Sequence, residues 1–145
     1  MPAITGSFSG KVSQQMALAL SDQPNHELNL AEITGTQKTS DEAWNDATIT
    51  YWGTTDAVDG KGTQRGYFVN VHRDGERDWG TFEGKVAASA GQVTVEGTFH
   101  FTGGSGKYNG VSGGGAFQTK MSSPADVACT WRGTYELASA KAQAR

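Results

Sequence analysis

The sequence lacks several features that define large classes of proteins. Its 145 residues include a single cysteine, Cys129, so no disulfide can form within the chain and packing must hold the fold together. With only five leucines, the composition is unfavourable for a helical bundle. No apolar run approaches the roughly 18 residues of a membrane helix. Residues 1–6 carry neither the positive charge nor the apolar stretch of a signal peptide, so we expect a cytoplasmic protein without a membrane partner.

The chain also lacks a large excess of charge of either sign. The chain has 12 lysines and arginines against 15 aspartates and glutamates, a net charge of −3, and its basic residues do not cluster. Nucleic-acid binding relies on a basic surface, so we expect no nucleic-acid partner. The three histidines, His26, His72 and His100, are far apart and show no metal-ligand spacing. We therefore expect neither a metal nor another cofactor.

Glycine, in contrast, is abundant, with 20 residues or about twice its ordinary usage. Glycine and turn signals separate segments in which apolar and polar residues alternate, the pattern of half-buried strands. The alternation predicts eight strands, over residues 4–20, 27–38, 47–54, 64–73, 79–87, 92–101, 116–121 and 128–137. Asp74-Gly75 predicts a tight hairpin, and a slip of phase near Ala31 predicts a bulge. We expect one domain over residues 1–137 and a tail over 138–145.

A triplet of glycine, a small hydroxyl residue and an aromatic residue recurs along the chain. It occurs as Gly6-Ser7-Phe8, Gly80-Thr81-Phe82, Gly97-Thr98-Phe99 and Gly133-Thr134-Tyr135. On a strand, the glycine and the aromatic residue point to the same face, so tiny and large side chains alternate there. This alternation suits a small closed barrel better than the alternative, a sandwich of glycine-rich strands. We predict an all-β fold, a single antiparallel eight-stranded closed barrel.

The glycine-rich segment over residues 101–113 does not fit a phosphate-binding loop, because Phe101 and Tyr108 stand where that motif needs glycine and a hydroxyl residue. The run Gly103-Gly104-Ser105-Gly106-Lys107-Tyr108-Asn109-Gly110 instead resembles the glycine element of the allene oxide cyclase and dirigent-type barrels. The resemblance extends over residues 66–117. It implies a calycin-like barrel with an apolar cavity, often in a homo-oligomer such as a dimer or trimer. The catalytic polar residues of the plant cyclases have no match here, so cyclase activity is not implied.

The apolar faces of the predicted strands provide candidate residues for a ligand site in the barrel lumen. The expected ligand-binding side chains are Tyr51, Tyr67, Val69, Phe82, Phe99, Phe101 and Trp131. The glycines at 80, 84 and 97 are expected to leave space beside the rings. Polar residues of the opposite phase are expected on the outer surface: Asn70, His72, Thr81, Glu83, Lys85, Glu96, Thr98 and His100. In the reversed assignment, Glu83, Glu96 and His100 face inward as acid and base candidates.

These residues lead to three hypotheses about function. The first is that a small apolar molecule binds in the lumen. The second is a cyclase or isomerase that shapes a flexible apolar substrate in the same cavity by orientation and exclusion of water, so the sequence leaves open whether the protein is an enzyme. The third is a structural barrel with a filled interior. Trp44, in a polar loop, is the candidate for a ring at a cavity mouth, and Cys129 is expected to be a small core residue.

Overall fold

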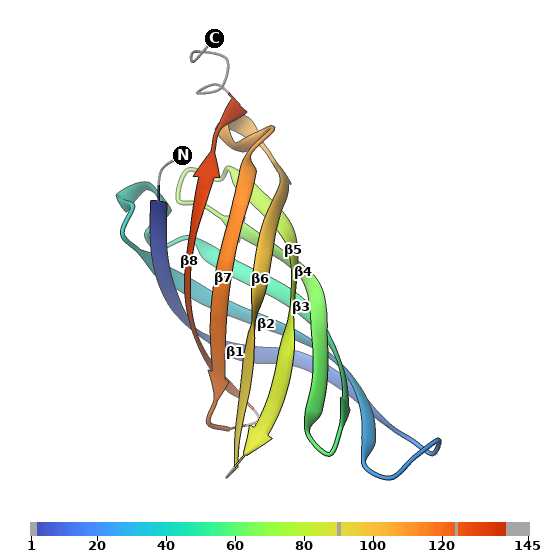
Figure 1. Cartoon of the computed structure of the whole chain (residues 1–145). Coiled ribbons are helices and arrows are strands. Elements are labelled where there is room, and N and C mark those ends of the chain that lie inside the picture. Colours follow the sequence, from blue (N-terminus) through green and yellow to red (C-terminus); the bar gives the residue numbers. More distant parts are fainter. Residues whose placement is uncertain (1–2, 90, 124, 139–145) are drawn as a thin grey trace.

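The chain folds into a closed barrel of eight antiparallel strands (Figure 1). The structure is a computed structural model that describes residues 3–89, 91–123 and 125–138. Each strand pairs with its neighbours in sequence, and β1 pairs with β8 to close the barrel. The strands are β1 (Ala3–Leu20), β2 (His26–Thr39), β3 (Thr48–Val58), β4 (Lys61–Val71), β5 (Arg77–Ser89), β6 (Gln92–Gly104), β7 (Ser112–Met121) and β8 (Asp126–Glu136). The predicted fold class is confirmed.

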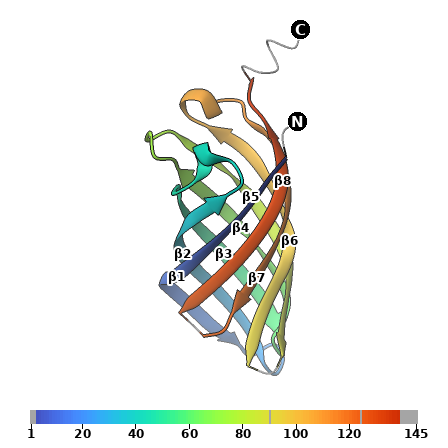
Figure 2. The same cartoon turned by 90° about the vertical axis from the view of Figure 1, so that its left-hand side faces the viewer.

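Short connections join the strands at both ends of the barrel. At the upper end in Figure 2, two single-turn 3-10 helices lie in the longer connections, η1 (Glu42–Trp44) between β2 and β3 and η2 (Gly106–Tyr108) between β6 and β7. The predicted Asp74-Gly75 hairpin joins β4 to β5, and Gly75 has a φ of 87°. No helix in the described ranges has the length and hydropathy of a membrane span. The predicted tail falls almost wholly on residues 139–145, outside the described residues.

The glycine-rich connection after β6 contains left-handed backbone, as its composition predicts. Gly106, Gly110 and Gly113 have φ values of 58°, 78° and 118°. Side chains with a Cβ rarely adopt such angles, so these three glycines set the path of the chain from β6 through η2 into β7. Gly103 and Gly104 belong to the end of β6 and do not have positive φ.

On β5 and β6 the predicted facing of the side chains is confirmed. Phe82, Val95 and Phe99 are buried inside the barrel. Exposed polar side chains occupy the opposite face: Glu83, Glu96, Thr98 and His100. The reversed assignment, with the two glutamates and His100 in the lumen, is therefore wrong. Carboxylates remain in water because burying an unpaired charge costs several kcal/mol.

The inner glycines do not leave the empty space that the sequence suggests. A Cβ on Gly97 would overlap the carbonyl oxygen of Glu83, and one on Gly80 would overlap that of His100. A Cβ on Gly84 would lie 2.6 Å from the carbonyl oxygen of Glu96. At these positions the backbone of the neighbouring strand fills the volume. The glycines thus allow adjacent strands to approach and bend, and the prediction of open space beside them is wrong.

The β1–β2 hairpin extends beyond the closed part of the barrel (Figure 1). β8 pairs with β1 only as far as Lys11, opposite Asp126, and one further bond joins Val12 N to Ala125 O at 2.9 Å. A register shift between Val12 and Gln14 follows at once, in the pairing of β1 with β2. The bulge that the sequence predicts near Ala31 is not found there, because Ala31 pairs in regular register with Gln15; the irregularity lies in β1, opposite Ile33 and Glu32 of β2.

Candidate functional site

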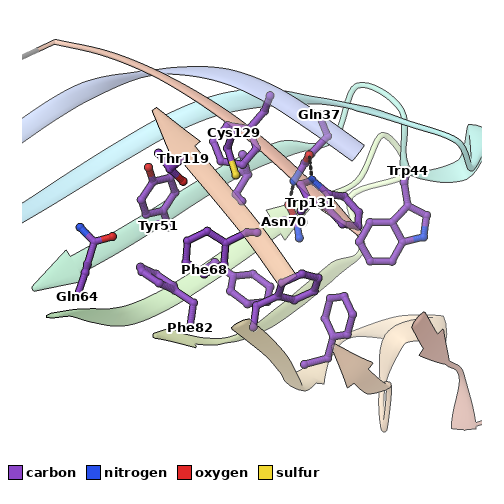
Figure 3. Close-up of a pocket in the computed structure, with 15 residues that line it drawn as sticks. Gln37, Trp44, Tyr51, Gln64, Phe68, Asn70, Phe82, Thr119, Cys129 and Trp131 are labelled. Carbon is purple, nitrogen blue, oxygen red and sulfur yellow. Dashed lines mark hydrogen bonds between the residues drawn. The ribbon is translucent and has the colours of Figure 1, made fainter. Parts of the chain in front are cut away.

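The barrel lumen encloses a small cavity of about 70 Å³ among aromatic rings (Figure 3). Its lining comes from all eight strands and from η1. The lining residues are Phe8, Gln37, Trp44, Ile49, Tyr51, Gln64, Phe68, Asn70, Phe82, Phe99, Phe101, Phe117, Thr119, Cys129 and Trp131. Most of this surface is apolar, with a few polar groups, which is the usual composition of a small-molecule site.

Edge-to-face contacts fix the positions of the rings around the cavity. The ring centroids of Tyr51 and Phe82 lie 5.5 Å apart with the planes at 90°, and those of Phe99 and Trp131 lie 5.7 Å apart at 87°. Phe68 meets Phe99 in the same manner at 6.1 Å. Such contacts favour one arrangement of the rings. The lumen is therefore mostly filled, and the cavity is the space that these rings leave between them.

Five of the seven residues predicted for the lumen line the cavity, namely Tyr51, Phe82, Phe99, Phe101 and Trp131. Tyr67 and Val69 do not, because β4 has the opposite phase to that expected. Tyr67 is 66% exposed on the outer surface, whereas Phe68 and Asn70 are buried. The prediction that Tyr67 and Val69 face the lumen is wrong.

The sequence contains the signal for the correct phase of β4. Gly66-Tyr67-Phe68 places a glycine two residues before Phe68, in the same spacing as the triplets that point Phe82 and Phe99 inward. Read in this way, Phe68 shares the inner face with Gly66. The alternate residues Tyr67, Val69 and Val71 favour the other phase, and alternation alone does not decide between the two.

Trp44 closes the upper end of the cavity from η1. Asp41 caps this helix, its side chain accepting a hydrogen bond from Ala43 N at 3.0 Å. The Trp44 ring is 1% exposed and packs against Phe101 and Trp131, with centroid distances of 5.8 and 6.3 Å. In Figure 3 its nitrogen points away from the other rings, so the cavity meets the carbon edge of the indole. The predicted placement of Trp44 at the cavity is confirmed.

A chain of buried polar side chains runs from the cavity wall toward η2. Trp131 Nε1 donates to Gln37 Oε1 at 3.0 Å, and Gln37 Nε2 donates to Asn70 Oδ1 at 3.1 Å. Asn70 Nδ2 donates in turn to Asp78 Oδ1 at 2.9 Å, and Asp78 Oδ2 lies 2.6 Å from His72 Nε2. We call these five side chains the upper network. It holds the Gln37 and Asn70 amides in fixed orientations at the cavity wall.

Sequence reasoning missed the upper network because alternation assigns polar residues to the outer face. Asn70 and His72 were both expected outside, and both are buried. The His72 ring stacks on Tyr108 with centroids 4.3 Å apart and meets Trp44 edge-on at 4.8 Å. Burial raises the pKa of the Asp78 carboxyl, and the hydrogen bonds from His72 and Asn70 act against that rise. Satisfied partners allow these groups to lie in the interior.

The lower part of the cavity presents hydroxyl, thiol and amide groups, from Tyr51, Thr119, Cys129 and Gln64. Gln64 Nε2 donates to Thr55 Oγ1 at 2.9 Å. The Tyr51 hydroxyl has no hydrogen-bond partner among the described residues, although its side chain is only 8% exposed. A hydroxyl that borders a cavity and lacks a partner is a natural contact for a polar group of a ligand.

The titratable groups in the cavity wall are neutral near pH 7. Burial raises the pKa of the Tyr51 phenol well above its ordinary value, and burial raises the pKa of the Cys129 thiol to about 11. Neither carboxylates nor histidines occur among the described lining residues. No group of three or more metal-binding side chains occurs in the described ranges. The cavity wall can therefore donate and accept hydrogen bonds, but it offers no charged group near neutral pH.

Comparisons with protein-family models, with curated proteins and with solved structures each gave no match to this chain.

Proposed function

We propose that the barrel binds a small, largely apolar molecule in its lumen, with the Tyr51 hydroxyl as the polar contact. The observation that carries the proposal is the cavity itself, an apolar space walled by edge-to-face rings, with Tyr51, whose hydroxyl has no hydrogen-bond partner among the described residues, in its wall. An apolar cavity tends to remain dry and to favour an apolar guest over water. The resemblance of residues 66–117 to the calycin-like allene oxide cyclase and dirigent-type barrels supports the same proposal.

The size of the cavity limits what can bind without rearrangement. At about 70 Å³ it has roughly half the volume of an engineered apolar cavity that accepts benzene, about 150 Å³. A guest of a few heavy atoms fits the present shape, and a larger one requires some of the rings to move. Gln64 is the partly exposed amide of the lower wall, and its side chain lies apart from the ring cluster (Figure 3), so its movement would break only the hydrogen bond to Thr55 that the structure gives it. We propose that ligands pass through this end.

An enzyme acting on an apolar substrate in the same cavity is the alternative function. Such an enzyme would have to work by orientation and exclusion of water, because Tyr51 and Cys129 stay protonated near neutral pH and provide no base. We rank simple binding first because it requires only what the cavity wall offers.

The test compares three probes, namely xenon, benzene and phenol. Xenon fits the present cavity, benzene requires the rings to yield, and phenol adds a hydroxyl to the same ring. We expect xenon and benzene to shift NMR signals of the lumen residues and to raise the melting temperature. Phenol should bind more tightly than benzene because its oxygen can meet the Tyr51 hydroxyl.

Two matched variants locate the site. One hydrogen bond of about 1 kcal/mol corresponds to a preference for phenol over benzene of roughly fivefold in affinity. Tyr51→Phe should remove this preference. Tyr67→Phe makes the same chemical change on the outer surface and should leave both affinities unchanged. Cys129→Leu, which fills part of the cavity, should weaken all three probes. If no probe binds, or if Cys129→Leu binds them undiminished, the lumen is not the site and a structural barrel remains.

A further inference from the structure

One edge of β1 has no partner strand, although the rest of the sheet is closed. Residues 14–20 pair with β2 alone, since β8 leaves β1 at Lys11, and Ser13 before them has no partner residue on β2. In the described part of the chain, no strand pairs with the other edge of this segment. An unpaired edge presents a row of backbone N–H and C=O groups to any strand of matching length. We call residues 13–20 the free edge.

From Gln14 to Leu20 the free edge lacks the devices that keep natural edge strands from pairing. Its sequence, Ser13-Gln14-Gln15-Met16-Ala17-Leu18-Ala19-Leu20, contains no charge, no proline and no glycine. Met16 and Leu18 are 70% and 61% exposed. They stand opposite Leu30 and Leu28 of β2, so four apolar side chains lie together on one face of the hairpin. Exposed edges in soluble proteins usually carry lysine, proline or a bulge that turns them away. Here the irregularity between Val12 and Gln14 lies at the start of the free edge and precedes the segment that would pair.

We propose that two copies of this chain dimerise by antiparallel pairing of their free edges about a two-fold axis. With Ala17 on the axis, Met16 of one copy faces Leu18 of the other. Residues directly opposite in an antiparallel pair point to the same face. The apolar faces of the two hairpins therefore join into one patch, and the sheet continues from one barrel into the other. Such an interface is isologous and closes at two subunits.

The charges at the ends of the free edge favour this orientation. Lys11 precedes the segment and Asp22 follows it. Antiparallel pairing brings the lysine end of one copy to the aspartate end of the other, whereas parallel pairing would bring like charges together. Lys11 keeps its own ion pair with Asp126 at 2.8 Å, and at a surface position it can also attract a second carboxylate.

The neighbouring charges argue against a lipid surface as the partner. Asp22 lies at the turn of the β1–β2 hairpin, and Asp56 and Asp59 lie at the end of the adjacent β3–β4 hairpin. Anionic membrane surfaces attract basic segments and repel acidic ones. A second copy requires no such charge, and it supplies a strand of matching length.

Sedimentation of the full chain over a wide range of protein concentration tests the proposal. We expect a concentration-dependent shift from the monomer mass of 15.3 kDa to twice that mass. Leu18→Lys and Met16→Lys should each remove the dimer and leave the circular dichroism and melting curve of the monomer intact, because both side chains are exposed. Thr98→Lys on the outer face of β6 is the matched control and should not change association.

Cross-linking tests the register. In the proposed dimer the two Ala17 Cα atoms lie about 5 Å apart, within the range that a disulfide spans. Ala17→Cys should therefore form a disulfide dimer on mild oxidation. Gln14→Cys should not, since its two copies are about 20 Å apart along the strand. Native Cys129 is buried and does not interfere.

Several results would overturn the proposal, and none of them bears on ligand binding in the lumen. The proposal is wrong if the chain remains monomeric at every concentration, or if the dimer persists in both lysine variants. A cross-link through Gln14→Cys without one through Ala17→Cys would reject the register. Flotation of a monomeric chain with anionic vesicles would assign the apolar hairpin to a membrane instead.

Discussion

At the scale of single residues, the glycines of the inner face show how closely the strands approach. A Cβ on Gly97 would overlap the Glu83 carbonyl and lie 2.5 Å from the Gly84 Cα. These are backbone atoms of a paired strand, which cannot move aside as the end of a flexible side chain can. We therefore expect Gly97→Ala to lower the free energy of unfolding by about 2 kcal/mol or more, measured by urea denaturation.

Thr98→Ala, one residue further along β6 and on its outer face, is the control for this measurement. It should change the free energy of unfolding by less than about 0.5 kcal/mol. A Gly97→Ala variant as stable as the original chain would show that the strands can separate there at little cost, and the close approach would not explain the glycine.

The Asp78 carboxylate gives a second prediction at this scale. Asp78→Ala leaves the donors of Asn70 and His72 without their acceptor in the interior. Breaking a buried pair in this way costs about 3 kcal/mol. Glu83→Ala, an exposed carboxylate on the same strand, should cost little. In a double-mutant cycle with His72→Ala, the two losses should add up to more than the loss in the double variant, and strict additivity would contradict the coupling.

Prediction from sequence succeeded residue by residue where one face is clearly apolar, and it failed where both faces of a strand carry mixed side chains. Phe82 and Phe99 were placed correctly because glutamate and threonine alternate with them. On β4, Tyr67 and Asn70 misled the assignment, since an exposed tyrosine and a buried asparagine both contradict average burial. Asn70 lies inside because Gln37 and Asp78 satisfy it, and those partners are distant in sequence.

At the scale of elements, a histidine ties two hairpins together at the lower end of the barrel. His26 Nδ1 lies 2.7 Å from Asp22 Oδ1, and Nε2 lies 2.6 Å from Asp56 Oδ1. Both contacts are strongest with a doubly protonated ring. The hydrogen bonds to Asp22 and then Asp56 raise the pKa of His26 above its ordinary value of 6.5.

The direction of this pKa shift predicts how the hairpin responds to pH. A histidine whose pKa is higher in the folded state stabilises that state fully below its unfolded pKa, and this stabilisation is lost as the pH rises through the folded pKa. We expect amide exchange near residues 20–26 to accelerate over that interval, after correction for the intrinsic pH dependence. NMR titration should give a lower His26 pKa in Asp22→Asn and Asp56→Asn. An unchanged His26 pKa in both variants would contradict the role of the two aspartates in holding the histidine.

The strands themselves were predictable to within a few residues, because glycine and proline turns separate clear alternations. The largest differences are at the end of β3 and at the start of β7, each four residues from the predicted boundary. The polar segment with Trp44 between β2 and β3 resembles a solvated loop in the sequence. That segment instead contains η1, and its tryptophan is among the most deeply buried side chains. The free edge of β1 was not predictable, because strand length alone does not reveal where β8 stops pairing.

At the scale of the whole molecule, the single cysteine reports on the opening of the barrel. Cys129 is buried, and burial raises its thiol pKa to about 11, so little reactive thiolate exists near neutral pH. We expect modification by a thiol reagent to be slow in the folded state and to follow the opening of the structure. Gly97→Ala should accelerate labelling, and saturating benzene should slow it. Fast labelling of the folded original chain would contradict the burial of Cys129.

Closure of the barrel through β1 and β8 also determines when the fold can be completed during synthesis. Lys11 leaves the ribosome 115 residues before Asp126, its partner at the end of the β1–β8 ladder. At a rate of synthesis of about 10 residues per second this interval is about 10 s. Throughout that time the whole outer edge of β1 is exposed, not only residues 13–20. The nascent chain can form hairpins in order, but its interior becomes sealed only after β8 has emerged.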